Sequence, residues 1–348
     1  MKVTARILIG LGAVAMTVAG PPVRAQQPPR FGERVDVARI IVDARVLDDR
    51  GNPIPGLAPD DFKVAIDGKA ARVETATWIG GRDTTIGAAP QESLSVSNAD
   101  ASAGAGRLIV FLFQKDLEPS RIVGSMRMLL KSRDFLGTLA PNDRVAVLSF
   151  DSNLKIWTDF TNDRERLDAV FGHDLLLARP PASQPVSMPS LAERLDAGTA
   201  RKVYSIERAL ELIGRALEPL PGSKSLVLIG HGFGRLSLGS VTMESGYGPA
   251  RRALVASRTA AFSLDVTDAD YHSLEAGLQL ISAQTGGFYA RTHLFTGLAM
   301  QRLAGAIAGY YVLYVEASQS DRATHGIEVQ LTRRKGQVLA SSAYSERD

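Results

Sequence analysis

RLIVFLFQKDLEPS, residues 107–120, joins an apolar run to a short polar segment. An apolar run of this length, bounded by polar residues, is typical of a strand buried on both faces of a sheet. A helical pattern follows it, with apolar side chains spaced three and four residues apart from Ile122 to Leu136. This order predicts the first strand and helix of a parallel sheet, with residues 114–120 forming the loop between them.

The same alternation continues along the chain. A turn signal at Pro141, Asn142 and Asp143 introduces the next apolar run, and Gly286 with Gly287 is expected just past the end of a helix. We expect strands at 144–150, 155–160, 225–229 and 260–266, and helices opened by Asn162 and spanning 203–217, 251–258 and 274–284. The pattern predicts an α/β domain over residues 107–308, with a doubly wound, mostly parallel sheet.

Short strands are predicted at both ends of the chain. An Asp67-Gly68 pair between two apolar runs is typical of a hairpin turn. Because each β set alone would leave an apolar face exposed, we expect residues 33–79 and 309–345 to form one small β-sandwich into which the α/β domain is inserted. Residues 80–106 are rich in small residues and predict a flexible linker. The predicted strands are 35–46, 62–66, 71–78, 310–316, 327–332 and 338–344.

The order of these pieces resembles the von Willebrand factor type A (VWA) family, in the form found in VWA-related exported bacterial chains. The pieces that carry the resemblance are VDVARIIVDARVLDDRGNPIPGLAPDDFKVAIDGK, LAPNDRVAVLSFDS, KSLVLIGHG, ISAQTGGFYAR, AGYYVLYVE and HGIEVQLTRRKG. Together they cover nearly all of the mature chain. The resemblance implies a doubly wound sheet with a binding site at the carboxyl ends of its strands.

The family's recurrent device is a metal-ion-dependent adhesion site, in which Asp-x-Ser-x-Ser, a Thr and a later Asp hold a divalent cation. Matching the motif places Gln114 at the first Asp, Asp116 and Glu118 at the two Ser positions, and His231 at the later Asp. Thr199 is a candidate for the Thr. A neutral amide lacks the charge that a hard cation needs, and an imidazole suits zinc better than magnesium. We therefore expect a degenerate site with neither metal nor other cofactor.

Three functions remain open. The first is an exported, non-catalytic module that binds a protein partner through two loops, with Gln114, Asp116, Glu118, Ser120, His231, Phe233 and Arg235. The second is a cation-dependent binding protein that uses Asp116, Glu118 and His231 as rearranged ligands. The third is an exported α/β hydrolase with His231 as base. A purely structural interpretation is open too, with Asp116 and Glu118 as solvated acids in the first turn of the helix.

Other clusters carry weaker signals. Asp265, Asp268, Asp270 and His272 follow a predicted strand closely and could bind a cation. The glycines of residues 230–234 allow tight turning, but they match neither the P-loop nor the dinucleotide pattern. Because no nucleophile, base and orienting group are linked by the sequence, we expect no enzyme.

Residues 1–25 have the character of a secretory signal. Lys2 and Arg6 precede an apolar core at 7–19, and Val23 to Ala25 fits a small-residue cleavage site. The core is too short for a membrane span, which needs about 20 residues. We expect a removable signal, with a retained N-terminal anchor as the alternative, and a secreted or periplasmic protein with no membrane span after removal of the signal.

The chain has no Cys, so disulfides are excluded. The 40 basic residues include Lys2, Arg6 and Arg24, and removing these leaves 37 basic and 37 acidic residues in the mature chain. A neutral chain has no general attraction to nucleic acid, so no nucleic-acid partner is expected. The resemblance to the VWA family implies a protein partner.

Overall fold

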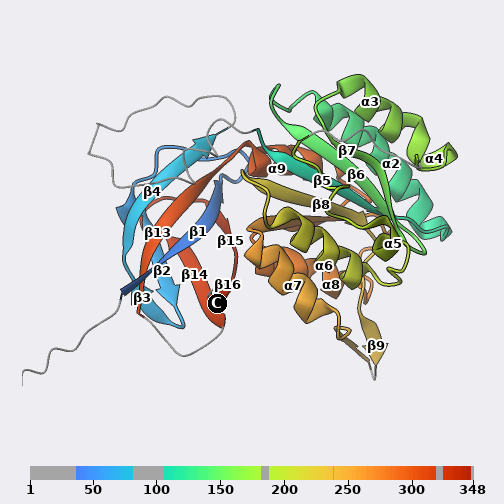
Figure 1. Ribbon diagram of the computed structural model, residues 1–348. Helices are drawn as coiled ribbons and strands as arrows, with labels where there is room; N and C mark the ends of the chain where they lie inside the picture. Colours follow the sequence, from blue (N-terminus) through green and yellow to red (C-terminus); the bar gives the residue numbers. More distant parts are fainter. Residues whose placement is uncertain (1–36, 81–105, 182–187, 238, 319–323, 346–348) are drawn as a thin grey trace, which may run out of the picture. The chain divides into compact units, whose positions relative to one another are not determined.

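A mostly parallel six-stranded sheet organises the α/β region (Figure 1). The computed structural model describes residues 37–80, 106–181, 188–237, 239–318 and 324–345, all within one compact unit. Five strands are parallel, and the edge strand β7 runs antiparallel to β6. The mostly parallel α/β sheet expected from the sequence is confirmed. In sheet order the strands are β12 (Tyr289–Arg291), β11 (Thr259–Asp265), β8 (Lys224–Gly230), β5 (Leu108–Gln114), β6 (Arg144–Phe150) and β7 (Leu154–Thr161).

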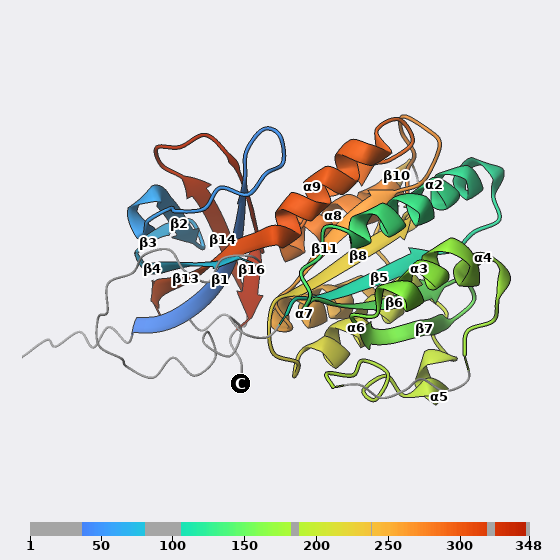
Figure 2. The ribbon, with the colours of Figure 1, turned by 90° about the horizontal axis from the view of Figure 1, so that it is seen from above.

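Helices cover both faces of this sheet, as Figure 2 shows for α2 and α9 on one side and α6 and α7 on the other. Alternate residues of β5 belong to two separate buried clusters, one containing Phe111 and the other containing Val110. This explains why the strand is apolar throughout. The first cluster includes side chains of α2 (Pro119–Leu136), α3 (Arg164–Ala169), the π-helical turn η2 (Val170–Asp174), α4 (Leu175–Leu177) and α9 (Thr296–Ala308). The second includes side chains of α5 (Ala197–Ala200), α6 (Ile206–Leu217), α7 (Tyr247–Ala256) and α8 (Glu275–Thr285).

Helix ends follow local capping chemistry and correct several predicted bounds. Asp163, not Asn162, caps α3, because its side chain accepts a 3.0 Å hydrogen bond from the Arg166 amide. Ser205 caps α6 in the same way, so this helix begins at Ile206 and not at 203. The predicted helix 251–258 is α7, which begins at Tyr247 and ends at Ala256. The helix predicted at 274–284 is α8, and Gly286 with φ of 81° ends it.

The two ends of the chain pair with each other in two antiparallel four-stranded sheets. β1 pairs with β13, and β2 pairs with β14. Asp67 and Gly68 have φ of 50° and 79°, which fits the hairpin turn predicted there. In order, one sheet is β15 (Gln337–Ala340), β1 (Val37–Leu47), β13 (Gly309–Ser318) and β4 (Val73–Gly80). The other is β16 (Ala343–Ser345), β14 (Thr324–Leu331), β2 (Phe62–Ile66) and β3 (Lys69–Ala71).

Both sheets contribute to one buried apolar cluster, which includes Val42, Val64 and Tyr311. The strand predicted at 338–344 is wrong as a single element. It is split into β15 and β16, which belong to different sheets. The strand is interrupted at Ser341, where the chain passes from one sheet to the other. The Ser341 hydroxyl donates to the Gln284 carbonyl at 3.0 Å. The remaining short elements are the 3₁₀ turn η1 (Pro59–Asp61) and the hairpin of β9 (Arg235–Ser237) and β10 (Ser240–Thr242).

Several predicted segments lie outside the described residues, wholly or in part. They include the signal at 1–25, most of the linker at 80–106, residues 33–36 of the N-terminal β segment and residues 319–323 of the C-terminal β segment. None of the helices in the described part of the chain is both long enough and apolar enough to cross a membrane.

Candidate functional site

The candidate site lies where β5 and β8 end side by side. These two strands are parallel neighbours, and the chain continues from β5 into α2 and from β8 into the β9–β10 hairpin. Open α/β sheets bind their ligands at such points, outside the carboxyl ends of the strands. Gln114 is the last residue of β5, and His231 directly follows β8.

Gln114 joins the two strand ends through its side-chain amide. Its Oε1 accepts a hydrogen bond from the His231 amide at 3.2 Å, and its Nε2 donates to the Gly232 carbonyl at 2.9 Å. The side chain is buried, with 8% of the residue exposed. The amide therefore has both a donor and an acceptor role that a carboxylate could not fill.

The glycines after β8 are explained by this close packing. A Cβ on Gly230 would lie 2.5 Å from Gln114 Oε1. Gly232 has φ of 103°, and a Cβ there would lie 2.3 Å from the Leu274 carbonyl oxygen. A side chain would clash with the Gln114 side chain at Gly230 and with the Leu274 backbone at Gly232, so close packing explains glycine at both positions.

Asp116 is neutralised from within the protein. Its Oδ2 forms an ion pair with Arg121, and its Oδ1 accepts a hydrogen bond from the Glu118 amide at 3.1 Å. Burial acts to raise the pKa of Asp116, but the hydrogen bond from Arg121 and that from Glu118 prevail and lower it. The Arg121 guanidinium thus supplies the positive charge beside Asp116.

His231 is a neutral imidazole in this setting. Its Nε2 lies 3.7 Å from Asp116 Oδ2, and its buried Nδ1 has no hydrogen-bond partner among the described residues. The pKa of His231 is lowered to about 4, mainly by burial. The positive charge of Arg121 also lowers this pKa, and its effect is larger than the opposite effect of Asp116. At neutral pH the Asp116–His231 contact is therefore not an ion pair.

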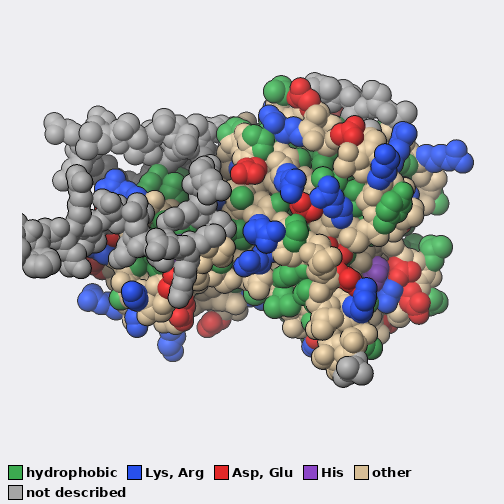
Figure 3. Space-filling view, turned by 60° about the horizontal axis from the view of Figure 1, so that its bottom comes forward, with side chains coloured by type: hydrophobic (Ala, Val, Ile, Leu, Met, Phe, Trp, Pro, Cys, Tyr) green, Lys and Arg blue, Asp and Glu red, His purple; other side chains and the backbone are tan. Residues whose placement is uncertain are grey.

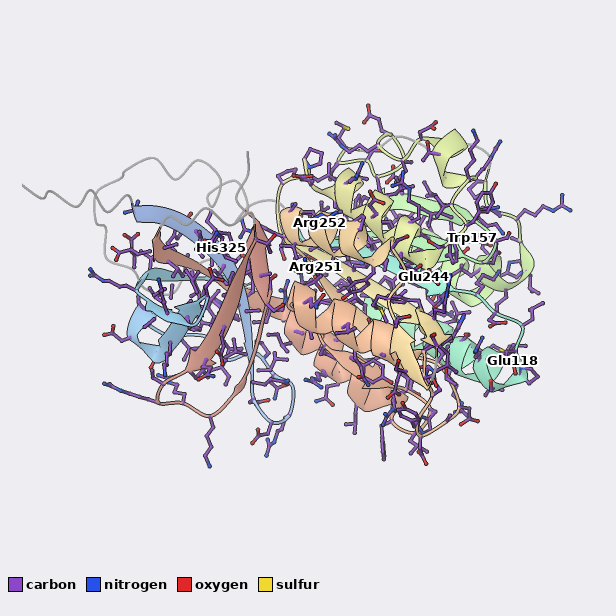
Figure 4. The ribbon with its side chains drawn as sticks, turned by 90° about the horizontal axis from the view of Figure 1, so that it is seen from below. Glu118, Trp157, Glu244, Arg251, Arg252 and His325 are labelled. Carbon is purple, nitrogen blue, oxygen red and sulfur yellow. The ribbon has the colours of Figure 1, made fainter. Side chains whose placement is uncertain are left out.

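The other predicted site residues are spread around these two loops. The Ser120 carbonyl accepts a 2.8 Å hydrogen bond from the Asp268 amide, and Phe233 is buried beside Tyr247. Arg235 is exposed and forms an ion pair with Glu244 at 2.8 Å. Glu118 is exposed at the start of α2 (Figure 4).

Thr199 is engaged elsewhere. Its hydroxyl donates to Asp196 at 2.8 Å, and the two residues line a separate hollow of about 650 Å³ with Arg215. Lys115, between Gln114 and Asp116, has its ammonium 5.7 Å from the centre of the Trp157 ring, which Figure 4 labels. Its Nζ donates to the Leu175 carbonyl at 2.8 Å.

These residues do not fit an adhesion-type metal ion. Both polar atoms of the Gln114 amide form hydrogen bonds within the protein. Asp116 forms an ion pair with Arg121, and the Thr199 hydroxyl donates to Asp196. A magnesium or manganese site needs several free oxygens, most of them charged. The donor set here offers too few.

A second polar cluster lies at the end of β11. Asp265 Oδ2 contacts His272 Nε2 at 2.6 Å and accepts a hydrogen bond from the Tyr289 hydroxyl at 2.8 Å. Ligand atoms of Asp265, His272 and Glu275 lie within 4.8 Å of one another. Arg291 compensates part of the negative charge by donating two hydrogen bonds to Glu275, at 3.0 and 2.8 Å.

Only part of this cluster could be found in the sequence. The predicted group comprised Asp265, Asp268, Asp270 and His272, and of these Asp268 and Asp270 are exposed. Sequence reasoning missed Glu275, Tyr289 and Arg291. The available signal was their position, since Glu275 begins α8 and the other two lie on β12, next to β11 in the sheet.

No family model and no curated protein matches this sequence. Solved structures that the comparison matches to this one include the conserved hypothetical protein BatB from Bacteroides thetaiotaomicron, with 16% identity and a TM-score of 0.37 over 58% of this chain and 97% of that one. Another is a von Willebrand factor type A protein from Catenulispora acidiphila, with 8% identity and a TM-score of 0.40 over 89% and 73%. With TM-scores this low, the likenesses carry no conclusion about function.

Proposed function

We propose that the chain is an exported, non-catalytic interaction module with a VWA-like domain, which binds a protein partner without a metal ion. The observation that carries the proposal is the Gln114 amide, which holds the ends of β5 and β8 together by two hydrogen bonds. The loops that a metal would otherwise organise are fixed here by the chain itself. Preorganised loops lose less entropy on binding.

The roles of the predicted residues divide by exposure. Gln114 and Phe233 are buried and would position the loops, whereas Glu118 and Arg235 are exposed and would contact the partner. Asp116 and Arg121 would keep their loop closed through their ion pair. In this proposal the partner is bound by the loops 114–120 and 231–238.

The histidine contacts support a non-catalytic role. His272 and His293 bond to the carboxylates of Asp265 and Asp270, and His231 faces Asp116. A nucleophilic mechanism would need a hydroxyl or thiol within hydrogen-bond reach of such a base. Among the described residues no Ser, Thr or Tyr hydroxyl bonds to these three rings. A hydrolase is therefore less well supported.

We also infer the setting of the domain. The two antiparallel sheets would form a small β-sandwich from residues 33–79 and 309–345, with the α/β domain 107–308 inserted and 80–106 as its linker. The signal at residues 1–25 would direct the protein to the periplasm or outside the cell. Analysis of the mature N-terminus in an exporting host tests this part, and an intact Met1 would contradict it.

Metal dependence is tested on the purified protein by elemental analysis and thermal melting. We expect no stoichiometric metal and no change in melting temperature with magnesium, manganese, zinc or chelator. One equivalent of bound metal, with a melting temperature lowered by chelator, would favour the cation-dependent alternative with Asp116, Glu118 and His231. In that case Asp116→Ala and His231→Ala should both lose the metal, with Asp134→Ala as the control.

A further inference from the structure

Three loops at the carboxyl edge of the sheet are tied into one surface. The Asp268 amide donates to the Ser120 carbonyl at 2.8 Å, which joins the loop after β11 to the start of α2. His293 Nε2 lies 3.3 Å from Asp270 Oδ1, and Arg127 donates to the His293 carbonyl at 3.1 Å. These bonds connect the loop after β12 to both of the others. We call the exposed part of these loops, residues 117–118, 268–271 and 294–295, the three-loop face.

Large apolar side chains are exposed on this face. Leu117 is 87% exposed, Tyr271 72%, Leu294 67% and Phe295 63%. On the adjoining solvent side of α2, Val123 and Met126 are about half exposed as well, at 46% and 48%. Single exposed apolar residues are ordinary, but such a group on neighbouring loops is typical of an interaction site.

The free charge on the three-loop face is acidic. Glu118, Asp268 and Asp270 are exposed, and no Lys or Arg forms an ion pair with them in the described part of the chain. Two nearby bases are paired with acids, Arg121 with Asp116 and Arg291 with Glu275, whereas Arg127 on α2 donates to the His293 carbonyl and forms no ion pair among the described residues. In Figure 3, acidic, basic, histidine and hydrophobic side chains lie together towards the right-hand edge, the side on which Figure 4 places Glu118.

We propose that the three-loop face docks a protein segment that presents apolar side chains flanked by Lys or Arg. The apolar side chains would cover Leu117, Tyr271 and Phe295, and the bases would pair with Glu118, Asp268 and Asp270. Complementary charge guides the encounter and the choice of partner, while apolar burial supplies affinity. This inference rests on the proposed function and names the chemistry of its partner. It places the partner against the loops that follow β5, β11 and β12, instead of the loops that follow β5 and β8.

A random peptide library displayed on phage is the probe, selected against the full protein. We expect enriched peptides that combine Leu, Ile or Phe with Lys or Arg. Synthetic copies should bind the double variant Asp268→Lys, Asp270→Lys at least about tenfold more weakly at low salt, a change of about 1.4 kcal/mol. Leu117→Ser with Phe295→Ser should weaken binding similarly. Matched controls are Glu328→Lys and Ile41→Ser, on exposed residues of β14 and β1, which should leave the dissociation constant unchanged.

Each other outcome identifies a different error. Peptides that lose binding with Arg235→Glu but not with the three-loop variants would leave the proposed function standing and overturn this inference. No enrichment on any form of the protein would overturn both. Enriched acidic peptides would contradict the charge argument. If the protein sediments as a dimer and the apolar variants sediment as monomers, the face binds a second copy of the chain. If the protein binds phosphatidylcholine or phosphatidylglycerol vesicles, the face binds a lipid surface.

Discussion

At the scale of single residues, the Gln114 side chain holds two strand ends together with two hydrogen bonds. It joins the end of β5 to the backbone after β8, and it needs both a donor and an acceptor to do so. Arg121 complements this by neutralising Asp116. In the proposed function the guanidinium supplies this positive charge permanently, because it is fixed to the chain and always ionised.

The first prediction concerns Gln114. Gln114→Ala should lower the free energy of unfolding by about 1–3 kcal/mol, because the His231 amide and the Gly232 carbonyl would lose their partner inside the protein. Urea denaturation measures the change. Gln330→Ala is the matched control, since Gln330 is exposed on β14 and its loss should cost less than about 0.5 kcal/mol. Equal effects of the two changes would show that the amide bridge is not needed.

The second prediction is a pH dependence carried by His231. Burial lowers its pKa to about 4 in the folded protein, from an ordinary value of 6.5. As the pH falls, the unfolded chain therefore binds the proton first. The stability from neutral His231 is complete above the ordinary pKa and is lost as the pH falls towards 4. The full loss is on the order of 3 kcal/mol.

The measurement is the difference in unfolding free energy between about pH 7 and pH 4.5, in the original protein and in His231→Gln. The variant cannot take up this proton, so its stability should fall less over that interval. His173→Gln serves as the control, because the His173 side chain is 66% exposed. Parallel curves for the original protein and His231→Gln would rule out a depressed pKa at this position.

At the scale of elements, α2 shows which features sequence patterns reveal. The spacing of apolar residues after β5 predicts the helix, and its buried side chains include Met128, Leu129 and Phe135. The close approach of this helix to β11 could not be predicted, because it depends on Gly124 meeting a backbone distant in sequence. A Cβ on Gly124 would lie 2.0 Å from the Val266 carbonyl oxygen.

The third prediction compares two glycines in helices. Gly124→Ala should destabilise the protein by about 1–3 kcal/mol or more, since the added methyl group forces α2 away from the end of β11. Gly297→Ala in α9 is the counterpart, because nothing lies within 4 Å of a Cβ there. Alanine favours the helix, so this change should gain up to about 1 kcal/mol. Thermal unfolding of both variants distinguishes close packing from helix propensity, which alone would stabilise both.

At the scale of the whole molecule, the sequence predicts strands well and the side-chain contacts between elements poorly. Apolar runs predicted β5, β6, β8 and β11, because each is buried on both faces. The role of Gln114 could not be predicted, since it follows from contact with residues more than a hundred positions later. Tyr289 and Arg291 are only 14 and 16 positions from Glu275, but their contacts with it join two separate elements, β12 and α8.

The last prediction tests how the two ends of the chain depend on each other. Tyr311 on β13 is fully buried; its hydroxyl donates to the Ile54 carbonyl at 2.8 Å and accepts from the Leu57 amide at 2.9 Å. Tyr311→Phe keeps the ring but leaves two backbone groups without this partner, so it should cost about 1–3 kcal/mol. Tyr204→Phe, at a residue that is 79% exposed, should change little.

Because β13 pairs with both β1 and β4, we expect the loss from Tyr311→Phe to reduce hydrogen-exchange protection of the amides of both strands together. Loss of protection confined to residues 54–57 would instead mean that the hydroxyl stabilises only its local turn.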